Sequence, residues 1–354
     1  MTTSRWILCA AMVAALLVVR PAGAQPQTIP SEIVQSQQTL TAAQRNVVRA
    51  KVDADLHRLQ TGDPTDIAEA RKSLIEGFRQ PGASRIFLLD YSARISGNLG
   101  PVLAADRPLP VRLNAMIVAS HLVDAGVIEH IRTGLTDPSP AVRYWAAKAA
   151  TKAAGQLGDG LHARLLEILR PAVNKAQGDH VAGQLLLAVI ALSPPEAIDL
   201  AINALNERIT ARAADIRLSP APDRAAMRAL FPRIIFQLDS LPDATPRGFI
   251  RITYRHLVLS ARLADPGATR DEQITGVLRQ DNIEMVRYAD RALREMLKAV
   301  EADMQAVPGP IDELATAGKW ADIRALRLPA WKQYLSKPPF NFTDAELAVA
   351  GRDQ

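Results

Sequence analysis

Three arginines, Arg247, Arg251 and Arg255, recur at intervals of four residues. In a helix this spacing places the three guanidinium groups in one stripe on one face. Guanidinium groups form paired hydrogen bonds with carboxylates and phosphates, so the stripe is a candidate binding site for an acidic ligand. It lies in a segment, 203–262, that has ten arginines, no lysine and five acidic residues. The alternatives are a solvated helix face, or internal pairs with acids of neighbouring helices.

Metal binding and catalysis are the other chemistry to consider. Two of the histidines have a carboxylate one helical turn away, in the pairs Asp53/His57 and His121/Asp124. Such a pair supplies two ligands, whereas a zinc site needs three or four, and the sequence offers no further ligands at a suitable spacing. Metalloprotease, nucleophile-elbow, phosphate-loop and dinucleotide-binding motifs are all absent. We therefore predict no catalytic residue, no metal and no cofactor, and interpret both pairs as surface polar contacts.

A recurring turn indicates which elements must position these side chains. The spacing Asp-x4-Val-Arg occurs three times, and each copy precedes a run rich in alanine and other apolar residues. Aspartate is a favoured residue just before a helix, and proline is favoured at the first helical position. In the copy with the most regular helix, Asp137 is predicted to cap the helix that contains Val142, Ala146 and Ala150. The residues assigned to the three turns are Asp106, Arg112, Asp137, Arg143, Asp281 and Arg287.

These turns and the helical pairs around them resemble the HEAT-like repeat family, in a short bacterial variant, most specifically over residues 106–192. The copies at Asp106 and Asp137 lie 31 residues apart, an interval shorter than the roughly 40–47 residues usual for HEAT and armadillo repeats. The resemblance implies an all-α, right-handed α-solenoid of helical hairpins. It also implies that Asp106, Asp137 and Arg143 form a ladder that holds successive turns in register.

Hydrophobic periodicity and breaks at proline and glycine divide the whole chain. Asp63 and Pro64 are predicted to begin a helix, and 84–105 is predicted to form two short helices or a broken one. The aromatic tail is expected to cover the exposed apolar end of the repeat array, the alternative being an aromatic ligand-binding lip. The predicted segments are a signal peptide (1–24), a flexible leader (25–40), N-terminal helices (41–105), a repeat core (106–192), further hairpins (193–305) and a capping tail (306–354).

The first residues have the pattern of an export signal. Arg5 precedes an apolar run, Trp6 to Val19, and the sequence Ala22-Gly23-Ala24 suits a cleavage site. The run is too short to span a bilayer, so we expect no transmembrane segment after cleavage. Cleavage would also remove Cys9, the only cysteine, and leave a chain without disulfides. We expect export to a bacterial periplasm or to the exterior.

Charge and architecture together suggest a class of function. Without Arg5 and Arg20 the chain keeps 42 − 2 = 40 basic residues against 37 acidic ones, a net charge of +3. That excess is too small to indicate a nucleic acid partner. We expect a non-catalytic scaffold or binding protein that presents an extended helical surface to a protein or to an acidic envelope polymer. The alternative is an envelope hydrolase or lyase with a site in the 193–354 half.

Overall fold

The computed structural model describes residues 28–176, 179–269 and 274–349. Within these ranges the chain is all-helical and has no strand, which confirms the predicted all-α class. None of the helices in this part combines the length and the apolarity needed to cross a membrane. The predicted signal peptide, 1–24, lies outside the described residues.

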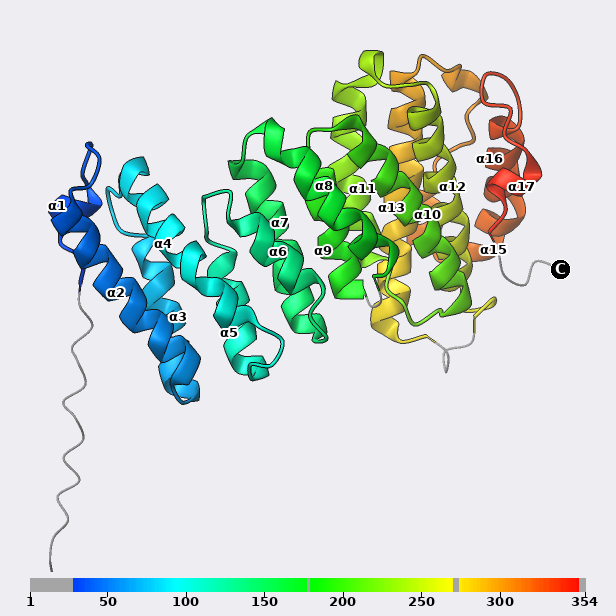
Figure 1. Cartoon of the computed structure of the whole chain (residues 1–354). Helices are drawn as coiled ribbons and strands as arrows, with labels where there is room; N and C mark the ends of the chain where they lie inside the picture. The colour runs from blue at the N-terminus through cyan, green and yellow to red at the C-terminus, as the bar shows by residue number, and fades with distance from the viewer. Residues whose placement is uncertain (1–27, 177–178, 270–273, 350–354) are drawn as a thin grey trace, which may run out of the picture.

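The main helices form pairs that stack in a row in the order of the chain (Figure 1). Each even-numbered helix from α2 to α12 packs against the odd-numbered helix that follows it. Successive even-numbered helices also pack on one another, and so do successive odd-numbered helices from α3 to α13, which gives two layers. The helices are α2 (Ala42–Thr61), α3 (Pro64–Gly77), α4 (Arg85–Leu103), α5 (Leu109–Ala119), α6 (Val127–Leu135), α7 (Pro140–Gln156), α8 (Asp159–Asn174), α9 (Asp179–Ile190), α10 (Pro195–Ala214), α11 (Ala221–Phe236), α12 (Ala244–Ala264) and α13 (Gly276–Ala299).

Local signals set several of the helix starts. Thr41 and Gln44 form a reciprocal capping box at the start of α2, in which the side chain of each residue accepts a hydrogen bond from the backbone N–H of the other. Asp63 accepts hydrogen bonds from the backbone N–H groups of Thr65 and Asp66, with Pro64 at the first helical position, so the predicted start of α3 is confirmed. These caps depend on residues within one helical turn, which is why the sequence alone reveals them.

Two predictions for the N-terminal region are wrong. The leader is ordered from Thr28 onward, because Ile29, Ile33, Val34 and Leu40 are buried and the short helix α1 (Ser31–Val34) packs on α4. Residues 25–27 lie outside the described part. The segment 84–105 forms one continuous helix, α4, from Arg85 to Leu103, and it continues through Pro101.

The tail after α13 covers the last helical pair with short helices, shown in orange and red in Figure 1. Trp331 is completely buried, and its indole Nε1 donates to Oδ1 of Asp290 on α13 at 3.2 Å. The Tyr254 hydroxyl on α12 donates to the carbonyl of Leu328 at 3.3 Å. The elements are α14 (Asp312–Thr316), α15 (Trp320–Asp322), a π-helical turn (Ile323–Arg327), α16 (Leu328–Leu335) and α17 (Asp344–Leu347).

Small residues allow α5, α6 and α7 to approach closely. Alanines of α7 such as Ala146 and Ala150 are fully buried against the neighbouring helices. At Gly134 in α6, an added Cβ would lie 2.5 Å from Sδ of Met116 on α5 and 2.8 Å from Cβ of Ala146 on α7. Both separations are below van der Waals contact, so glycine is required there by packing.

We predict that Gly134→Ala destabilises the protein by about 1–3 kcal/mol, the usual cost of overpacking a core. Gly155→Ala is the matched control, because Gly155 is also helical but has open space at its Cβ position. The control should be neutral, or more stable by up to about 1 kcal/mol through helix propensity. Urea unfolding of the three proteins measures both effects, and an unchanged free energy for Gly134→Ala would contradict the close approach.

Candidate functional site

A buried ion pair joins two successive helical pairs at the predicted repeat turn. Arg112 on α5 donates from Nε to Oδ2 of Asp137 at 2.7 Å and from Nη2 to Oδ1 at 3.2 Å. The Arg112 side chain is 9% exposed and that of Asp137 is 4% exposed. Oδ1 of Asp137 also accepts from the backbone N–H of Ser139 at 2.7 Å. The carboxylate therefore fixes the α6–α7 turn onto the preceding pair.

This geometry corrects the predicted role of Asp137. The residue that precedes α7 is Ser139, and its side chain makes no capping hydrogen bond. The partner of the Asp137 carboxylate is Arg112 of the preceding turn, not Arg143 of its own. Arg143 donates instead to the carbonyl oxygens of Asp137 and Pro138, both at 2.8 Å, and these bonds stabilise the backbone of the α6–α7 turn.

The other two copies of the spacing do not form the same contact. Asp106 is exposed and bonds with no residue in the described part of the chain. Asp281 was expected to open a helix, but Thr275 caps α13 and Asp281 lies inside it, where it accepts from the Ser219 hydroxyl at 2.8 Å. Arg287 contacts the tail through Asp312, at 3.1 Å. The prediction of a third repeat turn at Asp281 is therefore wrong, because α13 begins before the motif.

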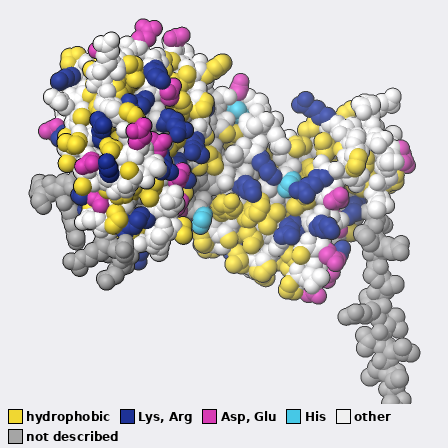
Figure 2. All heavy atoms as spheres, turned by 180° about the vertical axis from the view of Figure 1, so that it is seen from behind, with side chains coloured by type: hydrophobic (Ala, Val, Ile, Leu, Met, Phe, Trp, Pro, Cys, Tyr) yellow, Lys and Arg dark blue, Asp and Glu magenta, His cyan; other side chains and the backbone are white. Residues whose placement is uncertain are grey.

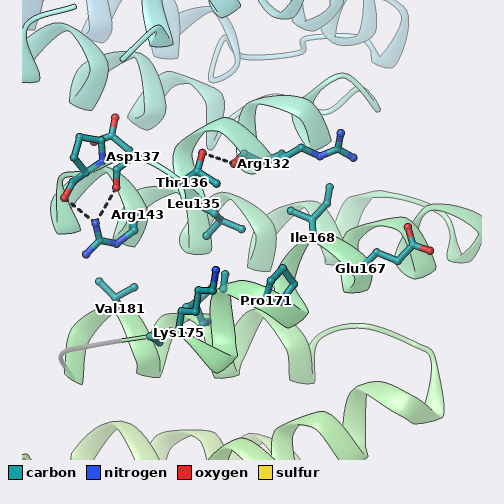
Figure 3. Close-up of a pocket in the computed structure, with 14 residues that line it drawn as sticks. Arg132, Leu135, Thr136, Asp137, Arg143, Glu167, Ile168, Pro171, Lys175 and Val181 are labelled. Carbon is teal, nitrogen blue, oxygen red and sulfur yellow. Dashed lines mark hydrogen bonds between the residues drawn. The ribbon is translucent and has the colours of Figure 1, made fainter. Parts of the chain in front are cut away.

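An open cleft lies between the α6/α7 pair and the α8/α9 pair (Figure 3). Its volume is about 750 Å³, in the range of ligand pockets. It follows the C-terminal half of α8, because α6 has 9 residues and cannot cover all 16 residues of α8. The apolar lining consists of Leu135, Pro138, Ile168, Pro171, Ala172, Ala176, Val181 and Leu185.

Charged side chains stand around this cleft. Arg132 pairs with Glu129 at 3.2 Å, and Arg143 is held by its two carbonyl partners. Lys175 and Glu167 are exposed, and neither has an ion-pair partner among the described residues. Figure 3 shows Leu135 on one side, with Pro171 and Lys175 on the other and the amine of Lys175 directed into the cleft. The arrangement suits an apolar ligand segment flanked by polar groups.

A second hollow, which we call the aromatic groove, adjoins the cleft. It is lined by Leu113 of α5, by Pro140, Ala141, Tyr144 and Trp145 of α7, and by His180 and Val181 of α9, and its volume is about 380 Å³. Val181 lines both the groove and the cleft. The rings of Tyr144 and Trp145 meet edge to face, with centroids 6.0 Å apart, and the Lys148 ammonium lies 4.4 Å from the Trp145 ring centre. Half-exposed aromatic rings of this kind are common in binding surfaces.

The arginine stripe on α12 is aligned as its spacing predicts, but the tail and α10 contact it. The Arg247 guanidinium lies 4.9 Å from the Phe342 ring centre, and Arg251 lies 3.7 Å from Oε1 of Glu346. Arg255 donates to the side-chain oxygen of Asn206, and its pKa is lowered by burial and by Arg251. These contacts favour internal pairing over an external ligand at the stripe.

The two histidine–carboxylate pairs are not brought together as metal ligands. Asp53 pairs with Arg94 and Arg49, and Asp124 accepts from Ser92 and from the backbone of its own turn. Across the described ranges, no group of three or more histidine, cysteine or acidic side chains is placed to hold a metal ion.

Sequence reasoning missed a buried polar network between α10, α11, α12 and α13. Arg212 is 0% exposed and donates to Asn282 Oδ1 at 2.7 Å, to Ser260 Oγ at 3.1 Å and to His256 Nδ1 at 3.2 Å. Asp223, also 0% exposed, lies between Arg212, at 3.7 Å, and Arg208, which bonds it directly.

The electrostatics of this network follow from its burial. Burial lowers the pKa of Arg212 to about 10, so the guanidinium stays charged at neutral pH. Burial, together with Arg212, Arg208 and Arg255, holds the pKa of His256 well below 6.5. One signal was available in the sequence: Arg212 continues the apolar stripe of α10 that includes Leu205 and Ile209, so a charged residue occupies a core position.

No protein-family model, curated protein or solved structure matches the chain.

We predict that Asp137→Asn costs about 3 kcal/mol of stability, because it leaves the buried Arg112 guanidinium without its counter-charge. In a double-mutant cycle with Arg112→Met, the two changes should couple by more than about 1 kcal/mol. A cycle with Arg143→Gln is the control and should be close to additive, since Arg143 bonds backbone carbonyls. Denaturant unfolding of the five variants measures both cycles, and stronger coupling to Arg143 would refute the assignment.

We also predict that stability falls as the pH is lowered from about 7.5 to 5. In the unfolded chain His256 takes up a proton near pH 6.5, whereas the folded protein keeps it neutral, so acid favours unfolding. His256→Gln retains an acceptor for Arg212 and removes the titration. Urea midpoints at both pH values should therefore decline less for the variant than for the wild type; an equal decline would show that His256 is protonated in the folded state.

Proposed function

We propose that this chain is an exported, non-catalytic binding protein built as a right-handed, HEAT-like α-solenoid. The two layers of helical pairs in sequence order support the solenoid, because each pair contacts mainly the pairs before and after it. The Arg112–Asp137 pair supports the family resemblance, since it links consecutive turns through the Asp and the Arg of the motif. Export rests on the signal pattern in residues 1–24.

The cleft together with the aromatic groove is the binding site that we favour. The two hollows meet at Val181 and cross the α7 and α9 helices, so an extended chain could occupy both. Their linings are mostly apolar, with Trp145 and Tyr144 as large anchors and Lys175 and Arg143 at the edge. Apolar anchors surrounded by polar groups are the usual composition of a protein-binding surface. A segment of a partner protein therefore fits better than a uniformly charged envelope polymer.

The alternative, an envelope enzyme with a site in the 193–354 half, receives no support from the buried network. His256 and Asp223 converge there with two arginines, which is a combination that an enzyme could use. His256, Asp223 and Arg212, however, are each 0% exposed, so a substrate has no access to them. The Arg208 side chain is 11% exposed and is bonded to Asp179 and Asp223. Their bonds join helices α10 to α13, and this is a structural role.

The binding proposal predicts that Trp145→Ala reduces capture of the partner from the envelope fraction of the native host at least tenfold. Loss of about 2 kcal/mol is typical of an aromatic anchor at the centre of an interface. Phe236→Ala is the matched control, because Phe236 is 91% exposed at the end of α11, away from both hollows. Quantitative pull-downs with the wild type and both variants test this. Equal capture by Trp145→Ala and wild type would exclude the groove, and selective capture of an acidic polymer would favour the other ligand class.

A further inference from the structure

Four side chains from three helical segments form a surface group that we call the cationic cluster: Arg79, His121, Lys148 and Lys152. Arg79 lies two residues after the end of α3, His121 lies two residues after the end of α5, and the two lysines lie one turn apart on α7. Helices α3, α5 and α7 pack side by side in one layer. The Phe78 and His121 rings, 6.3 Å apart between centroids, bring the end of α3 next to the end of α5.

The positive charges of the cluster are not neutralised by acidic side chains. Within the part of the chain that the structure describes, Arg79, Lys148 and Lys152 form no ion pair, and the one polar contact is that of Lys148 with the Trp145 ring. Asp124, the acid nearest to His121 in sequence, is bound by Ser92 and its own turn. Figure 2 shows Lys and Arg side chains gathered around a histidine on the narrower half of this face, with few acidic side chains between them.

The charges of the cluster, on the adjacent helices α3, α5 and α7, lower the pKa values of two of its members. Burial, followed by Lys152, Arg79 and Lys148, lowers the pKa of His121 to about 4, so the imidazole is neutral at pH 7. Burial and the charges of Lys148 and Arg79 also lower the pKa of Lys152. A partly buried group of like charges is unfavourable in the free protein, and an anion that binds there would relieve the repulsion.

We propose that the cationic cluster is a binding site for a phosphate group that carries close to two negative charges. A phosphate monoester has a charge of about −1.5 to −2 at pH 7, so two or three cations balance one such group, whereas a single carboxylate would leave an excess. Arginine and lysine supply charge-assisted donors, and the neutral His121 adds one N–H. Because Lys148 also contacts Trp145, a molecule attached to the phosphate would reach the aromatic groove. The site is separate from the arginine stripe and does not require the partner-protein proposal.

The test compares the wild type, a double variant, Lys148→Gln with Lys152→Gln, and a control, Lys319→Gln with Lys337→Gln. Both pairs remove two positive charges, and the control lysines are exposed residues of the tail. Titration calorimetry with inorganic phosphate at low ionic strength measures binding of the free anion. Sedimentation with phosphatidylcholine vesicles, with and without phosphatidic acid, measures binding of a lipid-borne phosphate monoester.

We expect the wild type and the control to bind, and the double variant to bind at least tenfold more weakly. Binding of inorganic phosphate identifies a free ligand, and binding of phosphatidic acid vesicles alone identifies a membrane-borne one. The melting temperature of the double variant should be unchanged or raised, because repulsion between unpaired cations is removed. The proposal is overturned if the wild type binds neither probe, if the double variant binds as the wild type does, or if its weaker binding accompanies a lowered melting temperature.

Discussion

The structure depends on one packing constraint: a helical pair can bury its apolar faces only against the pairs on either side of it. Even- and odd-numbered helices therefore stack in separate layers, and the apolar core continues along the whole row. Close approach is possible where residues are small, as at Gly134 and Ala146. The Arg112–Asp137 pair adds a directional contact to this packing, because its two hydrogen bonds fix the α6–α7 turn onto the preceding helical pair.

The candidate binding surfaces arise where this packing is incomplete. The cleft follows the part of α8 that the shorter α6 does not cover, and the aromatic groove lies at Tyr144 and Trp145 of α7, with Leu113 of α5 and Val181 of α9 as its neighbours. At the end of the row, by contrast, the last helical pair is covered, because the tail packs on α12 and α13 and buries Trp331. A surface that is left open in the middle and covered at the end is consistent with binding along the row.

Charged side chains have two different roles in this structure. In the second half, Arg212 bonds side chains from two other helices and holds them in one arrangement, at the cost of burying a charged group. Removing one partner from such a network is expected to lower the free energy of unfolding more than replacing the whole network by apolar side chains, because it leaves a buried polar group unsatisfied. In the first half, Lys148 and Lys152 form no ion pair with any described residue and remain partly accessible. Paired, buried charge indicates a structural role, whereas unpaired, accessible charge indicates a role in binding.

The all-α class, the start of α3 at Pro64 and the importance of Asp137 could be predicted from the sequence, because periodicity and capping depend on residues within one or two helical turns. The sequence did not determine which arginine pairs with Asp137: Arg112 lies 25 residues away, and Arg212 and Asn282 are 70 residues apart. Nor did it show that the tail would contact the α12 stripe, or that three helices would gather the cationic cluster. These contacts depend on how each helix is rotated and displaced against its neighbours, and only the tertiary packing fixes that geometry.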